Sequence, residues 1–313
     1  MSGMNLRTIF ITCSLLSAVQ LGLFAEKLIL HFDVNETLIA RDSAVGMSSE
    51  EMIAARLAHQ VLDRWDERVL EPISYADYVR TVLYPDLDYN AKQRHIGQFL
   101  NYLRQVDHPL RAEVEAKHQL AMERLDGRFV FPSFYKLIRK LDREGADYAV
   151  VLRTFGYDLP LVMQEVNGQL DRPFFTLQGR VRKGQVFLAH SPDQESCVDR
   201  IEAVYQLFKE SSHLALQDHY DDWNGSGKLR QHSKVFPIDL EDSSVVSIFF
   251  DDNVVLAPGS PTNIVHPVHP TTGEQLEVAD LVETGHIVRV DTLQAILDDN
   301  YFIDRIDRLR THE

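Results

Sequence analysis

Several features are scarce in this chain of 313 residues, and each scarcity excludes a class of protein. Two cysteines, Cys13 and Cys197, are too few for a disulfide framework or a thiolate zinc site. Lysine and arginine total 32 against 47 acidic residues, and the net charge of −15 argues against a general nucleic-acid binder, which carries a basic surface. Beyond the N-terminal segment, no apolar run is long enough to span a membrane, which takes about 20 residues.

The N-terminal segment, residues 1–25, differs from the rest of the chain. Arg7 is its only charge, and an apolar stretch follows it as far as a small residue before Glu26. This order is typical of a secretory signal peptide, so we predict a signal at residues 1–25. With the signal removed, the protein is exported, periplasmic or secreted, and has no membrane span. With the signal retained, the protein is cytoplasmic or anchored at its N-terminus.

After the leader, apolar strand patterns alternate with helical patterns. Buried strands are predicted at residues 27–33, 147–154, 245–252 and 286–291, and a hairpin is predicted to turn at Lys183-Gly184. Strands separated by helices imply a parallel sheet with both faces covered. The predicted fold class is therefore α/β, with a Rossmann-like parallel sheet as its core.

The stretch between the first two strands has a purely helical pattern. Ser48 and Glu51 have the spacing of a capping box, and apolar residues recur at helical spacing in the segments that follow. We therefore predict an all-helical insert at residues 45–128, with the core formed by residues 26–44 and 129–313.

Polar residues stand where three of the predicted strands end. Asp33 ends the first, Thr154 the second, and Asp251-Asp252 the third. In parallel sheets, ligands bind outside the carboxyl ends of the strands. Carboxylates that converge there either take up protons or bind a cation, and oxygen ligands favour Mg²⁺.

Positive charges are also available near these predicted strand ends. Lys228 and Lys234 precede the third strand and could balance an anionic substrate and a nucleophile. Arg153, beside Thr154, is a further candidate for a substrate contact.

Four segments together resemble the haloacid dehalogenase-like hydrolase superfamily. In chain order they are HFDVNETL, VVLRTFG, GKLRQHSKVFPID and IFFDDN, which lie within residues 31–253. The resemblance implies that Asp33 is the carboxylate nucleophile and that Thr154 hydrogen-bonds the transferred group. It implies that Lys234, or Lys228, holds the nucleophile and substrate, and that the helical insert is a cap. The implied Mg²⁺ ligands are Asp33, the backbone carbonyl of Asn35, Asp251 and Asp252.

Asn35 departs from the pattern of the family's phosphatases, which usually carry Asp there as general acid and base. An amide cannot transfer that proton, and such catalysis contributes roughly 10²–10⁴-fold. The resemblance therefore leaves three functions open. The first is a Mg²⁺-dependent phosphohydrolase acting on a small phosphorylated compound through an aspartyl-phosphate. The others are a metal-independent dehalogenase-type C–X hydrolase and a binding protein with impaired catalysis.

Overall fold

A mostly parallel sheet forms the core of the protein. The computed structural model describes residues 26–41, 43, 45–191 and 194–312, so the signal predicted at residues 1–25 lies outside the described residues. Within them, eight strands form one sheet, parallel from its first strand to its sixth and antiparallel over the last three. In sheet order the strands are β12 (Ile287–Arg289), β10 (Val245–Asp251), β1 (Lys27–Asp33), β4 (Tyr148–Thr154), β8 (His213–Asp218), β5 (Leu177–Arg182), β6 (Gln185–Ser191) and β7 (Gln194–Val198). The predicted α/β class is confirmed.

Two further pairs of short strands lie outside this sheet. They are β2 (Leu62–Asp63) with β3 (Ile73–Ser74) and β9 (Lys234–Pro237) with β11 (Val265–Val268). Helices fill most of the remaining described chain, as α1 (Ser49–Gln60), α2 (Tyr75–Tyr78), the π-helix η1 (Val79–Leu83), α3 (Tyr89–Gly97), α4 (Phe99–Gln105), α5 (Arg111–Leu125), α6 (Pro132–Glu144), α7 (Leu159–Gln169), α8 (Ile201–Glu210), α9 (Tyr220–Gly225), the 3₁₀ helix η2 (Arg230–His232), α10 (Val278–Thr284), α11 (Thr292–Leu297) and α12 (Tyr301–His312). In the described part of the chain, no helix combines the length and apolarity that crossing a bilayer requires.

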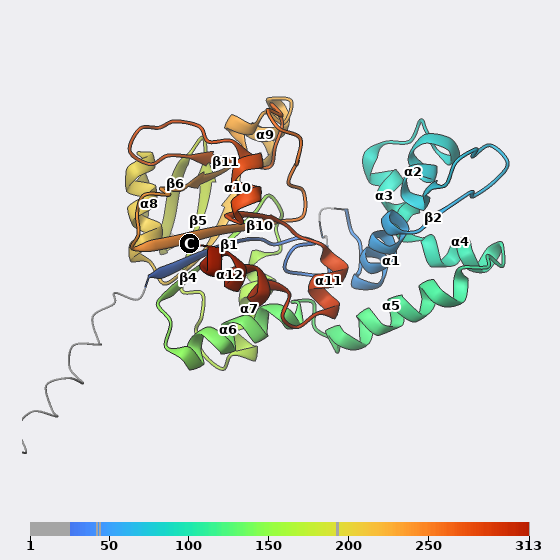
Figure 1. The fold of residues 1–313 in the computed structure, drawn as a ribbon, viewed down its shortest axis with the longest axis horizontal. Helices are drawn as coiled ribbons and strands as arrows, with labels where there is room; N and C mark the ends of the chain where they lie inside the picture. Colours follow the sequence, from blue (N-terminus) through green and yellow to red (C-terminus); the bar gives the residue numbers. More distant parts are fainter. Residues whose placement is uncertain (1–25, 42, 44, 192–193, 313) are drawn as a thin grey trace, which may run out of the picture.

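Strand β1 is buried on both faces, because its alternate side chains pack against helices on opposite sides of the sheet. The ring of Phe32 packs on Phe134 of α6 and Phe302 of α12, with centroids 5.5 and 5.1 Å apart. The neighbouring His31 lies 4.9 Å from the Phe208 ring of α8, on the other face. This period of two explains why the strand reads as an unbroken apolar run. Helices α6 and α12 therefore cover one face and α8 the other (Figure 1).

Helices α1–α5 follow β1 and lie to one side of the sheet, with α5 leading back towards α6 (Figure 1). Helix α1 begins with the predicted capping box, in which the Ser48 hydroxyl and the Glu51 carboxylate bond each other's backbone amides. One hydrophobic cluster contains Ile53 and Phe99 of these helices as well as Phe32 of the sheet. These helices thus share a continuous core with the sheet. The prediction that residues 45–128 are all-helical is wrong, because the chain between α1 and α2 folds back on itself and β2 pairs with β3 there.

The chain reverses its direction of strand addition next to β1. From β1 it goes to β4 and β8 on one side, and later to β10 and β12 on the other. The gap between the carboxyl ends of β1 and β10 is therefore a topological switch point, where open α/β sheets bind their ligands. This geometry fixes where the candidate site lies.

Candidate functional site

Three buried carboxylates meet across the switch point. Asp33 is the last residue of β1, Asp251 is the last residue of β10, and Asp252 follows it. Each offers an oxygen within 4.8 Å of the others, and all three side chains are buried. The three carboxylates therefore converge as predicted from their places at the ends of strands, because neighbouring parallel strands bring their carboxyl ends to one edge of the sheet.

One lysine bridges two of these carboxylates. Lys234, at the start of β9, donates from Nζ to Asp33 and to Asp251, the latter at 2.8 Å. Lys228 lies elsewhere: it is exposed, and its ammonium is 5.3 Å from the centre of the Trp223 ring. Of the two lysines considered from the sequence, Lys234 is the one that the fold brings to the cluster.

The third carboxylate is held by an arginine that the sequence analysis missed. Arg56 of α1 donates to Asp252 at 2.7 Å and also forms an ion pair with Glu36. The Thr37 hydroxyl donates to Asp252 at 3.2 Å and accepts from the backbone N–H of Asp252 at 2.9 Å. A sequence signal was present, because Arg56 is a lone charge between the buried Ala55 and Leu57–Ala58 of α1.

With every group of this site ionised, the formal charges leave an excess of two negative units. The carboxylates are Asp33, Asp251, Asp252 and Glu36, and the cations are Lys234 and Arg56. Four negative and two positive charges sum to −2, which one divalent ion would balance. The donor set of the cluster is oxygen only, so its residues fit Mg²⁺, which is bound through one or two carboxylates and keeps several waters.

Burial raises the affinity of this cluster for protons. Burial raises the pKa of Asp33 well above its usual value, although the Lys234 ammonium opposes the shift. Burial likewise raises the pKa of Asp252 to about 7, against the opposing effect of Arg56. Buried carboxylates of this kind hold a proton or a cation, and such perturbed groups cluster at functional sites.

Asn35 is fixed in a hydrogen-bond network beside the cluster. Its amide nitrogen donates to the carboxylate of Asp158 at 2.8 Å and to the Arg41 carbonyl at 3.1 Å. Its amide oxygen accepts from the Thr154 hydroxyl at 3.0 Å. A Cβ on Gly156 would lie 2.7 Å from that oxygen, so only glycine leaves this arrangement room. An amide suits position 35 because it can donate to Asp158, which an ionised carboxylate cannot do.

The predicted substrate contact of Arg153 is not supported by its position. The side chain is buried, and it donates from two nitrogens to Asp218 at 3.0 and 2.6 Å and from the third to the Val235 carbonyl at 2.7 Å. Strand alternation explains this outcome, because Arg153 and Thr154 point to opposite faces of β4. Arg153 joins β4, β8 and β9 to one another.

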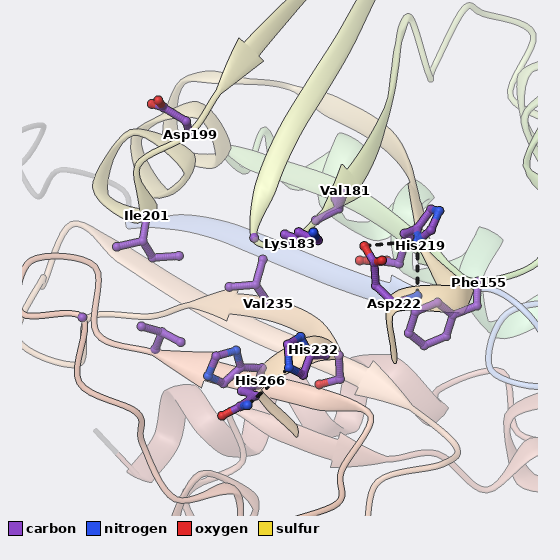
Figure 2. A pocket seen from close by; sticks show the side chains of 16 residues that line it. Phe155, Val181, Lys183, Asp199, Ile201, His219, Asp222, His232, Val235 and His266 are labelled. Atoms are coloured by element: carbon purple, nitrogen blue, oxygen red, sulfur yellow. Dashed lines mark hydrogen bonds and ion pairs between the residues drawn. The ribbon is translucent and has the colours of Figure 1, made fainter. Parts of the chain in front are cut away.

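A hollow of about 310 Å³ lies on the other side of β9 (Figure 2). Ser233 and Val235 line it, whereas Lys234 between them points to the carboxylates. The ring of Phe155 also lines the hollow, and Lys234 Nζ lies 5.4 Å from its centre. The hollow and the carboxylate cluster thus lie on opposite sides of β9.

The chain matches no protein-family model, and no curated protein or solved structure is detectably similar to it.

Proposed function

We propose that this protein is a Mg²⁺-dependent phosphohydrolase of the haloacid dehalogenase-like type, acting on a small phosphorylated compound. One observation carries the proposal: three buried carboxylates meet at the switch point of the sheet, and together with Glu36 they bring four formal negative charges against the two cations Lys234 and Arg56. An uncompensated buried charge is costly, so carboxylates gathered in this way hold either protons or a cation, and the proposal takes the cation to be Mg²⁺. Helices α1–α5 would be the inserted cap of such an enzyme.

The residues of the site can be given definite roles. Asp33 attacks phosphorus: its oxygen forms a new P–O bond, the bond from phosphorus to the ester oxygen breaks, and the leaving alkoxide takes a proton from water. Water then attacks the phosphorus of this aspartyl-phosphate, which releases phosphate and restores the carboxylate of Asp33. Lys234 holds the attacking carboxylate in place, and the hydroxyl of Thr154, which donates to Asn35 here, would bond the transferred group in place of that amide. Mg²⁺, when bound, supplies charge stabilisation to the phosphoryl oxygens.

The test compares an aryl phosphate and an alkyl phosphate as substrates for the full chain, with and without Mg²⁺. We expect turnover only with the metal, faster on the aryl ester, because its leaving group needs less help from a proton. Asp33→Asn should abolish both reactions. Asp126→Asn, a matched change at an exposed acid, should leave them unchanged. Activity that persists in Asp33→Asn would contradict the proposal.

The network around Asn35 favours a second candidate, a protein that binds phosphate esters without turning them over. In that case, the ligand binds with Mg²⁺, but no product forms and no covalent adduct on Asp33 is found by mass spectrometry after acid quenching. The dehalogenase-type alternative makes the opposite prediction for the metal. It would release halide from 2-haloacids at the same rate in metal-free buffer.

A further inference from the structure

A groove lined by cations runs along helix α6, although the chain as a whole has a net charge of −15. Its volume is about 620 Å³, and α5, the turn after it, α6 and the start of α12 form its walls. Six lining residues are Lys or Arg and one, Asp299, is acidic. The six cations are Arg124, Arg128, Lys136, Arg139, Lys140 and Arg143.

Four of the cations form one stripe on α6. Lys136, Arg139, Lys140 and Arg143 stand at positions i, i+3, i+4 and i+7, which share a face of a helix. The opposite face is apolar and buried in the core. Like charges at i, i+4 destabilise a helix, and this stripe contains two such pairs, 136 with 140 and 139 with 143. Helix stability alone therefore does not account for the stripe.

Half of these six charges are not neutralised by a carboxylate of the described residues. Across the part of the chain that the structure describes, Lys136, Arg139 and Arg143 have no carboxylate partner. Arg124 pairs with Asp299, yet its Nε is buried without a hydrogen-bond partner. Donors that are left unpaired in a concave site are available to an anionic ligand.

Lys140 and Arg128 have weak partners of their own. Lys140 lies 3.3 Å from Glu144 and 3.5 Å from Asp307, and Arg128 lies 3.7 Å from the exposed Asp126. Exposed pairs of this kind contribute little to stability, so a ligand can displace them at small cost. The groove therefore retains a clear excess of positive charge.

We propose that this groove binds a small polyanion with two or more linked phosphate groups, of the kind found in tripolyphosphate or a nucleoside triphosphate. The stripe from Lys136 to Arg143 extends about 10 Å along the helix, which suits a chain of charges better than one phosphate. A guanidinium group can donate two parallel hydrogen bonds to two oxygens of one phosphate. The volume is that of a small-molecule site, which typically has ≈ 300–1,000 Å³.

This proposal does not depend on the hydrolase proposal. No lining residue of the groove belongs to the carboxylate cluster. A concave groove walled by α5, α6 and the start of α12 favours a small ligand over a membrane surface, which would need a flat or convex basic face. Nucleic acid is disfavoured because the remaining acidic surface would repel a long polyanion.

The test is isothermal titration calorimetry on the full chain in metal-free buffer, so that Mg²⁺ cannot chelate the probe. Tripolyphosphate, ATP and orthophosphate are titrated separately. We expect tripolyphosphate to bind at least roughly tenfold more tightly than orthophosphate, because several charge-assisted bonds form at once. Binding of ATP comparable to that of tripolyphosphate would assign the site to the phosphate chain, and tighter binding of ATP would add a contact to the nucleoside.

Variants locate the site. Arg139→Glu with Arg143→Glu should weaken tripolyphosphate binding by roughly 100-fold or more, since each lost charge-assisted bond is worth about tenfold. Arg180→Glu is the matched control, because this exposed arginine of β5 is paired with Glu195 at 3.0 Å and lies outside the groove. It should bind as the wild type does. Asp33→Asn should also bind as the wild type does, which separates this site from the carboxylate cluster.

Specific results would overturn the proposal. They are an absence of tripolyphosphate binding, equally tight binding of orthophosphate, and an equal loss in Arg180→Glu. Binding to phosphatidylserine vesicles without any to tripolyphosphate would assign the groove to a membrane surface instead. Circular dichroism checks the fold of each variant. If Arg139→Glu with Arg143→Glu fails to fold, Arg139→Gln with Arg143→Gln replaces it, and unchanged tripolyphosphate binding there would also refute the site.

Discussion

The carboxylate cluster and the basic groove hold charge in opposite ways. In the cluster, every acid is buried and each is bonded by Lys234, Arg56 or Thr37. In the groove, the exposed Arg139 and Arg143 have no carboxylate partner within the described residues. The difference follows from solvation, because water stabilises an exposed charge while a buried one needs a partner in the protein. Removing a charge from the cluster should therefore change the stability of the protein strongly, whereas removing one from the groove should change it little.

The largest expected effect is on catalysis, at Asn35. In Asn35→Asp, the new carboxyl group faces Asp158, and two carboxylates at hydrogen-bond distance share one proton. The shared proton supplies the missing general acid, so the rate on an alkyl phosphate should rise by up to ~10²–10⁴-fold, with a smaller gain on an aryl phosphate. The measurement is kcat/KM for both esters.

The double variant, Asn35→Asp with Asp158→Asn, distinguishes the effect of the shared proton from that of a carboxyl group at position 35. The amide at 158 now donates to the carboxylate at 35, which lowers the pKa of that carboxyl group relative to the single variant. The gain on alkyl esters should then disappear at lower pH than in Asn35→Asp alone. Unchanged alkyl rates in both variants would mean that Asn35 does not stand in place of a proton donor.

The second prediction compares the two lysines. Lys234→Met leaves Asp33 and Asp251 buried without their cation, so we expect about 3–5 kcal/mol lower free energy of unfolding, as for other broken buried pairs. Lys228→Met changes an exposed side chain and should alter that free energy by no more than about 0.5 kcal/mol. Urea denaturation in metal-free buffer measures both. Equal stability of the two variants would refute the bridging role of Lys234.

The sequence could predict only those members of the cluster that stand at the ends of parallel strands. Asp33, Thr154, Asp251 and Asp252 follow apolar runs, and parallel strands bring such ends together. The strands β8 and β9 were not predicted, and β9 has only four residues. Without β9, nothing in the sequence distinguishes Lys234 from Lys228.

The part played by Arg56 could not be derived from the sequence for a different reason. Arg56 of α1 and Asp252 are 196 positions apart in the chain. Its approach depends on how α1 packs beside the sheet, which helical periodicity does not specify. Arg153 shows the converse, since a charged residue beside a predicted site residue turned out to face the other side of the strand.

The third prediction concerns His31, a buried titratable group. The ring of His31 lies among those of Phe208, Phe236 and Phe249, and both its nitrogens lack hydrogen-bond partners in the described part of the chain. His31→Phe should therefore raise the free energy of unfolding by about 1–3 kcal/mol, the cost of an unsatisfied buried polar group. His232→Phe, at an exposed histidine, should not.

The same variant should reduce the sensitivity of the fold to acid. Burial lowers the pKa of His31 well below 6.5, so the unfolded chain takes up a proton as the pH falls through 6.5 while the folded chain does not. Stability is therefore lost as the pH falls below that value, and less of it should be lost in His31→Phe. Urea unfolding at about pH 7.5 and about pH 5 measures the difference. An identical loss in wild type and variant would show that other groups cause the acid sensitivity.

The smallest expected effect is on the affinity for Mg²⁺, in a variant of Arg56. Its guanidinium is partly exposed yet bonds the buried Asp252, so it occupies an oxygen of a candidate Mg²⁺ ligand. Arg56→Ala changes the net charge of the site from −2 to −3, because one of its two cations is lost. We expect Mg²⁺ to bind roughly tenfold more tightly, about 1.4 kcal/mol, measured by calorimetry without substrate. Arg68→Ala, which removes an exposed arginine paired with Asp66, is the control and should leave the affinity unchanged. Weaker binding in Arg56→Ala would mean that Arg56 orients Asp252 for the metal instead of competing with it.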